Sequence, residues 1–265
     1  MLPPFRLARP TSLDEALTLV SEDNVPYCGG TELLLAMRAG LLRPAALVDL
    51  KRVPELSGIA VQDDVLVIGA ATTHADVAEH PAVRRADPAL ADVAHRVGNA
   101  RVRSQGTIGG NLCFAEPRSD LVALLACFAA SVTLAGGSGR RELPVQDFVQ
   151  GAYWTAREPD ELMVDVRVPL RPRRAVYLKF QVSERPTVGV AVSEEPTSGA
   201  CRLVVGAVGE VPLVVDVSGV EDLDPASIAD SVEPTPDLSG SAEYKRHLTA
   251  AYIRRALRRL KEEAR

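Results

Sequence analysis

The sequence contains few cysteines, and their spacing is not that of a metal site. Four cysteines, Cys28, Cys113, Cys127 and Cys201, are spread over 265 residues, and no two of them form a C-x-x-C pair. Zinc and iron–sulfur sites are typically built from closely spaced cysteines. We therefore expect neither kind of site in this chain, and we expect the thiols to be reduced and mostly buried.

Long apolar runs and an excess of positive charge are also missing. No stretch approaches the roughly 20 apolar residues that span a bilayer, and the N-terminus, MLPPFRLARP, is too short and too proline-rich for a signal peptide. The net charge is −5, whereas nucleic-acid binding relies on clustered Lys and Arg. The one dense basic run, 245–265, also carries acidic residues, which fits a solvated or partner-facing helix. We expect a cytoplasmic protein that neither spans a membrane nor binds nucleic acid.

Signatures of catalytic machinery are absent too. The chain has no G-x-S-x-G, G-x-G-x-x-G or G-x-x-x-x-G-K-[ST] motif, and no histidine adjoins a candidate nucleophile. In THADVAEH, 73–80, Thr73 is the expected N-cap, and only Asp76 and His80 share a helix face, so we expect no metal site with His74. Candidate ligand loops without acid–base groups are consistent with a cofactor that does the chemistry.

The chain has an ordinary globular composition, with 46% hydrophobic and 25% charged residues. Its length fits two domains or one large one. The pattern changes at the proline-arginine stretch PLRPRR, 169–174, which is the best candidate boundary. We expect a first domain at 1–170, with subdomains at about 1–52 and 53–170, and a smaller α+β domain at 171–265.

Residues 1–52 are expected to form a small α/β unit with parallel strands. Ser12 and Glu15 form a capping-box pattern at the start of a helix. The strand NVPYC, 24–28, is followed by the helix TELLLAMRAG, 31–40, which stops at Gly40, and by the strand AALVDL, 45–50.

The remaining segments mix strands and helices. We expect strands at 63–71 and 160–170, helices broken at Pro81 and Pro88 within 73–98, a deeply buried helix at 119–130, and a hairpin at 131–145. Beyond the boundary, the runs AVYLKFQV, TVGVAVSEE and ACRLVVGAVGE indicate an antiparallel three-stranded sheet, and the last 40 residues are expected to be helical.

Two glycine pairs carry the clearest sign of a ligand. YCGGTE, 27–32, and TIGGN, 107–111, each follow or lie within a strand-like segment and precede a helix. Consecutive backbone N–H groups in such loops form anion sites, and helix N-termini add partial positive charge. A tight turn explains either pair taken alone. Two such loops facing each other could hold a pyrophosphate.

Ser119 and Asp120 stand at the start of the buried helix. They could cap that helix without any ligand. Asp120 could instead accept a hydrogen bond from a ligand hydroxyl, such as a ribityl or ribose group. Their position in the sequence does not decide between the two interpretations.

The stretch VRSQGTIGGNLCFAEPRSDL, 102–121, resembles the signature of the FAD-binding, medium subunits of the molybdenum hydroxylases. That family includes CO dehydrogenase, bacterial xanthine dehydrogenases, and aldehyde and N-heterocycle dehydrogenases. YCGGTELLLAM resembles its other FAD loop, and DELMVDVRVP, YLKFQVSERPTVGVAV and GAVGEVP resemble its later segments. The order and spacing agree over nearly the whole chain, and T-I-G-G-N-x₈-D is the specific motif.

The resemblance implies a two-subdomain FAD domain of the vanillyl-alcohol-oxidase (PCMH-like) type, followed by an α+β domain. It implies that FAD phosphates meet two loops, that Asp120 binds the ribityl or adenosine side, and that Val97, Leu162 and Lys179 lie near the flavin. The residues of the two loops are Cys28, Gly29, Gly30, Thr31 and Glu32 in the first, and Thr107, Gly109, Gly110 and Asn111 in the second.

The resemblance also implies partners. These are a small subunit with two [2Fe–2S] clusters and a large subunit with the molybdenum cofactor, in a dimer of heterotrimers. Electrons would pass through the clusters to FAD and on to NAD⁺, a quinone or oxygen. Two other interpretations are a flavin-free scaffold with the same fold and a flavoenzyme that acts without partners.

The chain departs from the family pattern in two segments. After SER, where the family often has an aspartate, this chain has Pro186-Thr187. AYWTA carries the aromatic pair Tyr153-Trp154 where small or polar residues are common. Both segments are expected to border the flavin ring, so the identity of the electron acceptor stays open.

Overall fold

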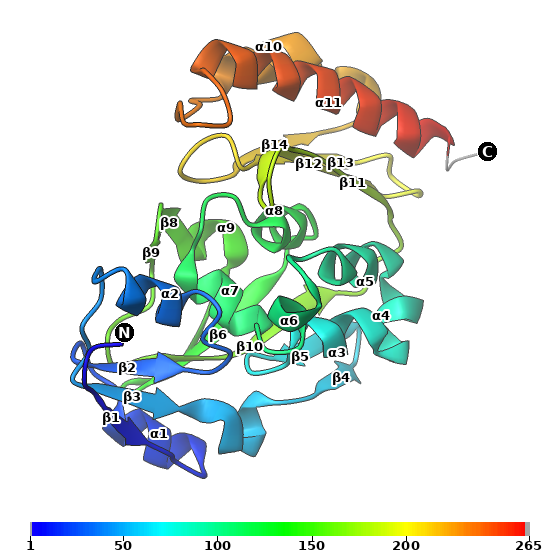
Figure 1. The fold of residues 1–265 in the computed structure, drawn as a ribbon. Helices are drawn as coiled ribbons and strands as arrows, with labels where there is room; N and C mark the ends of the chain where they lie inside the picture. Colours follow the sequence, from blue (N-terminus) through cyan, green and yellow to red (C-terminus); the bar gives the residue numbers. More distant parts are fainter. Residues whose placement is uncertain (1, 263–265) are drawn as a thin grey trace.

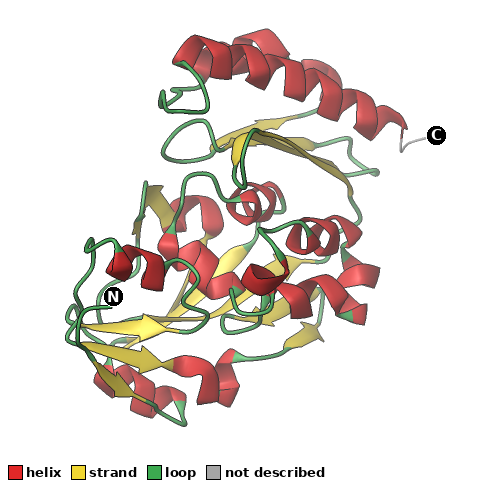
Figure 2. Cartoon of the chain, in the orientation of Figure 1, coloured by secondary structure: helices red, strands yellow, loops and turns green. Residues whose placement is uncertain are grey.

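The computed structural model describes residues 2–262 as a stack of three parts (Figure 1). A first lobe, 2–56, lies on one side of a second lobe, 57–169, and a C-terminal domain lies on the other side. The lobes and the domain each contain a sheet, and helices separate the second sheet from the third (Figure 2). The model confirms the expected mixture of helices with antiparallel sheets.

The first lobe is the expected parallel α/β unit with one additional strand. Its elements are β1 (Arg6–Ala8), α1 (Leu13–Leu19), β2 (Asn24–Tyr27), α2 (Leu33–Arg38) and β3 (Ala46–Asp49), with two short 3₁₀ turns at Leu50–Arg52 and Pro54–Leu56. The strand order is β1-β3-β2, and both pairings are parallel. Strand β1 was not predicted, because it has only three residues and pairs along one edge.

The predicted start of α1 and the predicted stop of α2 agree with the structure, whereas α2 begins at Leu33, two residues later than expected. The hydroxyl of Ser12 accepts a hydrogen bond from the backbone N–H of Glu15, as an N-cap does. The carboxylate of Glu15 reaches back one residue further than in a standard capping box, because it accepts from the N–H of Thr11. Helix α2 ends at Arg38, and Gly40 follows with φ +78°, a conformation that favours glycine.

The second lobe is built on a five-stranded antiparallel sheet with the order β4-β5-β10-β6-β7. Its strands are β4 (Ile59–Gln62), β5 (Val65–Gly69), β6 (Ser131–Gly136), β7 (Gly139–Pro144) and β10 (Leu162–Pro169). A small hairpin joins β8 (Val149–Gly151) to β9 (Trp154–Thr155). Strand β4 was not predicted, because three of its four residues are exposed and it lacks an apolar alternation.

Helices cover one face of this sheet. They are α3 (His74–Glu79), α4 (Pro81–Ala86), α5 (Pro88–His95), α6 (Ala100–Arg103), α7 (Ile108–Phe114), α8 (Asp120–Cys127) and α9 (Val145–Phe148). The breaks at Pro81 and Pro88 are confirmed, since each proline begins a new helix. Every residue of α8 is buried, as its apolar sequence predicts.

The two faces of the second sheet bury different parts of the chain. Met163, Val166 and Val168 of β10 join the core beneath the helices. Leu162 and Val164 of the same strand join a second core with α1 and β3 of the first lobe. This alternation across β10 fixes the first lobe against the sheet.

The C-terminal domain has four antiparallel strands in the order β11-β12-β13-β14, not the three that were predicted. They are β11 (Arg174–Gln181), β12 (Pro186–Glu194), β13 (Cys201–Gly206) and β14 (Leu213–Val217), followed by a 3₁₀ turn at Val220–Asp222 and by α10 (Pro225–Ser231) and α11 (Ala242–Glu262). Val188, Val190 and Val192 pack toward α11, whereas Ala191 and Tyr177 join the core that contains α8. The sheet therefore lies between α11 and α8 (Figure 1).

Residues 170–173 carry the chain from the second sheet to the third. Arg173 anchors this crossing, because its Nε lies 3.4 Å from a carboxylate oxygen of Asp87 and its guanidinium lies over the ring of Phe128. A division into independent domains at residue 170 stays a prediction.

Candidate cofactor site

The structure brings the two glycine segments together. A Cβ atom placed on Gly29 would lie 2.0 Å from the carbonyl oxygen of Gln105, so only glycine permits this approach. The side chain of Thr107 hydrogen-bonds the thiol of Cys28, whose pKa is raised by burial. The first loop, residues 28–32, therefore lies against the segment that leads into α7.

The first loop contains backbone N–H groups that are free to bind a ligand. Within residues 2–262, the N–H groups of Gly30, Thr31 and Glu32 have no hydrogen-bond partner. They are consecutive, half-buried, and immediately precede the start of α2. Gly30 has φ +69°, which lets the chain turn sharply here. Successive free N–H groups of this kind form a concave site for a phosphate oxygen.

The second glycine pair differs from what the sequence analysis expected. Gly109 and Gly110 do not precede a helix but lie in its first turn, with Thr107 as the N-cap of α7. The backbone N–H groups of this turn already have partners. Ile108 donates to the carbonyl of Thr72, Gly109 to that of Ala70, and Gly110 to the hydroxyl of Thr107. An anion at this turn would have to use side chains or exchange one of these bonds.

The two glycines of α7 also have different surroundings. A Cβ on Gly109 would lie 2.6 Å from the Cβ of Ala70, at the end of β5. A Cβ on Gly110 would have one neighbour within 4 Å, the hydroxyl of Thr107 at 2.9 Å. Gly109 is therefore required for packing of the helix on the sheet, whereas Gly110 faces open space that a ligand can enter.

Asn111 presents a free amide group beside this turn. Its side-chain oxygen accepts a 2.7 Å hydrogen bond from the hydroxyl of Ser119, and its NH₂ group has no protein partner in the described chain. Ser119 is the N-cap of α8 by position, but its side chain makes no capping bond. The hydroxyl of Ser119 thus orients Asn111 and leaves two amide donors for a ligand.

Asp120 is not a helix cap either. Its carboxylate is buried and accepts a 2.7 Å hydrogen bond from the hydroxyl of Tyr177 and a 2.8 Å bond from Lys179. Both partners belong to β11, so Asp120 connects α8 to the C-terminal domain. Burial and the charge of Asp120 raise the pKa of Tyr177 well above its ordinary value, which keeps that hydroxyl a donor.

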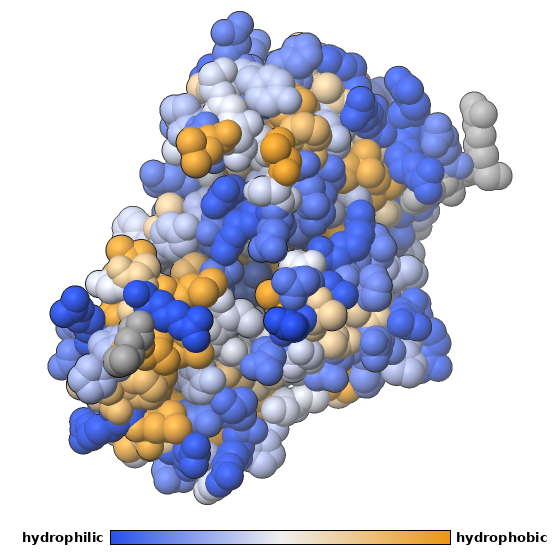
Figure 3. Space-filling view, viewed as in Figure 1, coloured by the Kyte–Doolittle hydropathy of each residue, from blue (hydrophilic) through white to orange (hydrophobic). Residues whose placement is uncertain are grey.

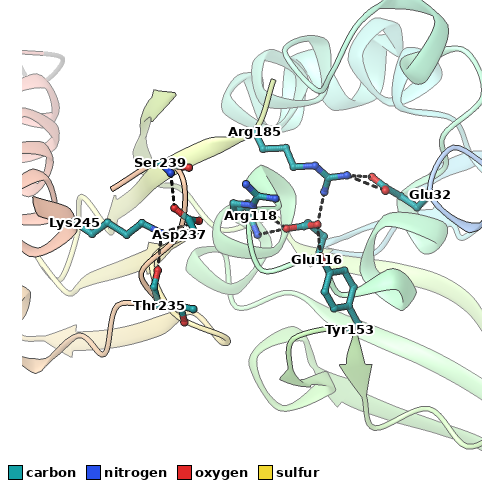
Figure 4. A network of polar contacts seen from close by, with 9 residues as sticks. All are labelled: Glu32, Glu116, Arg118, Tyr153, Arg185, Thr235, Asp237, Ser239 and Lys245. Atoms are coloured by element: carbon teal, nitrogen blue, oxygen red, sulfur yellow. Dashed lines mark hydrogen bonds and ion pairs between the residues drawn. The ribbon is translucent and has the colours of Figure 1, made fainter. Parts of the chain in front are cut away.

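A second connection to the C-terminal domain begins at the first loop (Figure 4). The guanidinium of Arg185, between β11 and β12, lies 2.8 Å from both carboxylate oxygens of Glu32. Its other nitrogen lies 2.6 Å from the carboxylate of Glu116, which Arg118 and the hydroxyl of Tyr153 also contact. A separate group in the same view, Lys245 with Asp237 and the carbonyl of Thr235, fixes the start of α11.

The two remaining predicted residues lie apart from each other. Val97 packs at the edge of the core beneath the helices, next to Arg96, whose carbonyl oxygen accepts from Lys179 at 3.5 Å. Leu162 is buried in the core that the second sheet shares with the first lobe. The structure therefore brings Val97 toward Lys179 and Asp120 but does not bring the side chain of Leu162 to them.

Sequence reasoning missed three side chains around the site: Tyr177, Arg185 and Glu116. Tyr177 could have been found, because it is two residues from Lys179 on a strand and thus shares its face. Arg185 and Glu116 lie in irregular segments with no periodicity, so their meeting depends on tertiary structure.

The described residues include neither a cluster of side chains that could hold a metal ion nor a helix that could cross a membrane. Among residues 2–262 there is no group of three or more His, Cys, Asp or Glu side chains that could hold a metal ion. His74 is buried behind the second glycine segment, and His80 instead caps α4 through Nδ1. No helix in the described part of the chain has both the length and the apolar character needed to cross a membrane.

Comparison with known families gives one match that covers most of the chain. The model of the FAD binding domain in molybdopterin dehydrogenase matches residues 3–171. The carbon monoxide dehydrogenase medium chain of Afipia carboxidovorans is 32% identical in an alignment 281 positions long, gaps included, that covers 98% of each chain. The nicotine 6-hydroxylase medium subunit of Paenarthrobacter nicotinovorans is 30% identical in an alignment of 274 positions that covers 97% of each chain.

Solved structures agree with these relatives. A chain of carbon monoxide dehydrogenase from Hydrogenophaga pseudoflava, solved without the Mo-pyranopterin moiety of its cofactor, superposes with a TM-score of 0.91 at 31% identity, covering 97% of this chain and 98% of that one. A chain of quinoline 2-oxidoreductase from Pseudomonas putida 86 has a TM-score of 0.91 at 27% identity, covering 100% of this chain and 99% of that one.

Proposed function

This chain belongs to the family of FAD-binding domains of molybdopterin dehydrogenases, and we propose that it is the FAD-carrying, electron-transfer subunit of a molybdenum hydroxylase complex. The observation that carries the proposal is full-length similarity to medium chains of such complexes, at 32% identity over 98% of both chains. The chain is thus an oxidoreductase subunit whose cofactor is FAD.

The residues at the site fit that cofactor. The three free N–H groups of Gly30, Thr31 and Glu32 suit the oxygens of a pyrophosphate. The open side of Gly110 and the free amide of Asn111 suit close contact from the second segment. We assign to the same site the predicted residues Cys28, Gly29, Thr107, Gly109, Asp120, Val97 and Lys179. Leu162 is not assigned, because its side chain lies in the core that the second sheet shares with the first lobe.

FAD supplies the redox chemistry, because it exchanges electrons with both one- and two-electron partners. The chain's own residues bind and orient it. Asp120 is held in place by Tyr177 and Lys179, so its carboxylate is oriented before a ligand hydroxyl arrives. Such preorganisation lowers the entropy lost on binding. Lys179 adds a positive charge beside that carboxylate, in a segment predicted to lie near the flavin ring.

We infer two partners: a small subunit with [2Fe–2S] clusters, from which FAD receives electrons, and a large subunit with the molybdenum cofactor, where substrate is oxidised. The proposed assembly is a dimer of heterotrimers in the cytoplasm. This chain covers nearly all of relatives that are named as medium chains, which supports separate polypeptides for the other centres. Leu35, Leu41 and Leu42, which are exposed on or directly after α2, offer a surface for a partner.

The test is the flavin content of the purified chain and its complex. We expect the visible absorption of oxidised flavin and one FAD released per chain on denaturation. Folded protein that neither retains nor rebinds FAD would favour a flavin-free scaffold. Turnover of a reduced substrate by the isolated chain would favour a flavoenzyme without partners. Co-expression with the neighbouring reading frames, followed by reduction of FAD with the substrate of the complex, tests the electron-transfer role.

A further inference from the structure

The two segments in which this chain departs from its family pattern meet at one carboxylate. Arg185 directly precedes the unusual Pro186-Thr187, and Tyr153 belongs to the unusual aromatic pair. Both contact Oε2 of Glu116, Arg185 at 2.6 Å and Tyr153 at 2.8 Å (Figure 4). Segments 32 residues apart, at 153 and 185, therefore form a single polar cluster around Glu116.

Through this cluster one guanidinium joins all three parts of the molecule. Arg185 belongs to the C-terminal domain, Glu32 ends the first loop of the first lobe, and Glu116 precedes α8 in the second lobe. One terminal nitrogen of Arg185 lies 2.8 Å from both carboxylate oxygens of Glu32, and this contact spans 153 residues of sequence. Hydrogen bonds between two ionised groups are stronger than those between neutral groups.

The surroundings of Glu116 keep its carboxylate charged for the contact with Arg185. Burial alone would raise the pKa of Glu116, but the hydrogen bond from Tyr153 and the charges of Arg185 and Arg118 outweigh burial and lower the pKa below its ordinary value. The carboxylate is therefore ionised at neutral pH. Two residues beside it have a left-handed backbone, Ala115 at φ 48° and Tyr153 at φ 59°.

These two residues are bonded to each other, since the N–H of Tyr153 donates to the carbonyl of Ala115 at 2.9 Å. The ring of Tyr153 also packs edge-on against Phe114. Ala115 is the C-cap of α7, a position at which the left-handed conformation is common. The backbone bond between Ala115 and Tyr153 keeps the ring of Tyr153 beside the Glu116 carboxylate.

We propose that Arg185 is a positioning residue that closes the cofactor site and slows the release of FAD. This inference rests on the proposed function. The residues assigned to FAD come from the first loop, from the second lobe (Val97, α7 and the start of α8) and from β11. Arg185 connects the same three parts. A cofactor that touches all three can leave only when they separate, and that separation breaks the contacts of Arg185.

The experiment measures the rate of FAD release from the purified, FAD-loaded protein, followed by the rise in flavin fluorescence after dilution. Arg185→Met removes the charge but keeps most of the apolar stem. We expect release to become about tenfold faster, as when one partner of a partly buried ion pair is lost. Arg174→Met is the matched control, because Arg174 pairs with Glu194 at the other end of the same β11–β12 hairpin. Its release rate should stay near that of the wild type.

Two further measurements separate a closing role from general stabilisation. High salt should speed release from the wild type but not from Arg185→Met, since only the wild type has these ion pairs to screen. The thermal midpoints of the apoproteins of Arg185→Met and Arg174→Met should be similar. Glu116→Gln provides a second route if Arg185→Met does not fold, and it should also speed release.

The outcomes distinguish this inference from the proposed function. Wild-type protein that holds no FAD would contradict the proposed function, and the inference with it. Wild-type protein that holds FAD, together with unchanged or slower release from both Arg185→Met and Glu116→Gln, would overturn the closing role alone. Equal acceleration in Arg174→Met would also overturn it, because the effect would then follow from weakening the hairpin.

Discussion

At the scale of single residues, Gly109 and Gly110 are neighbours with different tasks. Gly109→Ala would bring a methyl group within 2.6 Å of the Cβ of Ala70, so we expect a loss of about 1–3 kcal/mol in the free energy of unfolding. Gly110→Ala would displace only the hydroxyl of Thr107, and the gain in helix propensity offsets part of that cost. Denaturant unfolding of the two apoproteins measures the difference.

Substitutions at Gly110 also distinguish an effect on folding from an effect on FAD binding. Gly110→Val should give folded protein with little bound FAD, because its branched side chain would occupy the open side of the helix turn. FAD released on denaturation, per chain, is the quantity to compare with Gly110→Ala. A full complement of FAD in folded Gly110→Val would remove Gly110 from the site.

For Asp120, the structure adds two protein partners to the expected role in FAD binding. Under the proposed assignment, Asp120→Ala leaves FAD hydroxyls unpaired and should weaken FAD by about 1.5–3 kcal/mol, or roughly 10- to 150-fold in affinity. It also leaves Tyr177 and Lys179 without their carboxylate, so the apoprotein should lose stability as well. FAD titration and unfolding without FAD must therefore be measured in parallel.

Tyr177→Phe is the matched variant for that comparison. It removes one hydrogen bond to Asp120 but leaves the carboxylate and its pair with Lys179 in place. A smaller loss of FAD affinity than in Asp120→Ala is expected. If Asp120→Ala binds FAD as tightly as the wild type, Asp120 serves only to connect α8 with β11.

At the scale of secondary-structure elements, the sequence predicts those whose burial follows a simple period. Helices α1, α2 and α8 and strand β10 have caps, stops or apolar alternation that can be read locally. Strands β1 and β4 were missed because they are short or exposed and exist only through pairing with a neighbour. Strand β14, LVVDV, was also missed, although four of its five residues are apolar and half-buried.

The site could be predicted only in part for the same reason. The motif T-I-G-G-N-x₈-D locates the second segment, but the sequence does not reveal that its glycines lie inside α7 and that their N–H groups are already bonded. It also does not reveal the partners of Asp120, because Tyr177 lies 57 residues away. Local sequence patterns indicate which residues belong to the site, whereas the packing of distant segments determines which backbone N–H groups stay free for a ligand.

The start of α3 gives a prediction about pH. Burial and the nearby charge of Arg103 lower the pKa of His74 from 6.5 to about 4. The unfolded chain therefore takes up a proton near pH 6.5 that the folded chain accepts only near pH 4, so stability is lost as the pH falls through this window. Between pH 7 and pH 5 we expect a loss of about 2 kcal/mol in unfolding free energy from this residue.

His74→Phe should flatten that pH dependence, whatever its effect on stability at pH 7. His95→Gln is the control, because His95 is an exposed histidine at the end of α5. Denaturant unfolding at several pH values measures both. An unchanged slope between pH 7 and pH 5 in His74→Phe would show that His74 does not carry the effect.

At the scale of the whole molecule, an apolar surface on the first lobe bears on assembly. Leu35, Leu41 and Leu42 are 56%, 78% and 40% exposed, and they lie on α2 or directly after it. Figure 3 shows apolar surface over this lobe. Grouped apolar side chains that remain exposed commonly mark a protein interface.

We therefore expect Leu41→Asp to weaken assembly with the proposed partner subunits and to leave the fold and the bound FAD unchanged. Size-exclusion chromatography of the co-expressed chains measures assembly. Leu238→Asp is the control, since Leu238 is a fully exposed leucine of the C-terminal domain, at 109% relative accessibility. Complex formation by Leu41→Asp at the level of Leu238→Asp would exclude this surface as the docking site.

The long sequence separation between Glu32 and Arg185 means that the ribosome makes the second residue well after the first. These residues are 153 positions apart, and a ribosome that adds about 5–20 residues per second needs roughly 8–30 s to make the second after the first. Both glycine segments lie within the first 111 residues, but α7 packs against β10, so the second segment can pack only after residue 169 has been added. Under the proposed closing role, FAD that binds before Arg185 has been made is exposed to exchange, and the cofactor becomes committed to the chain only when Arg185 meets Glu32.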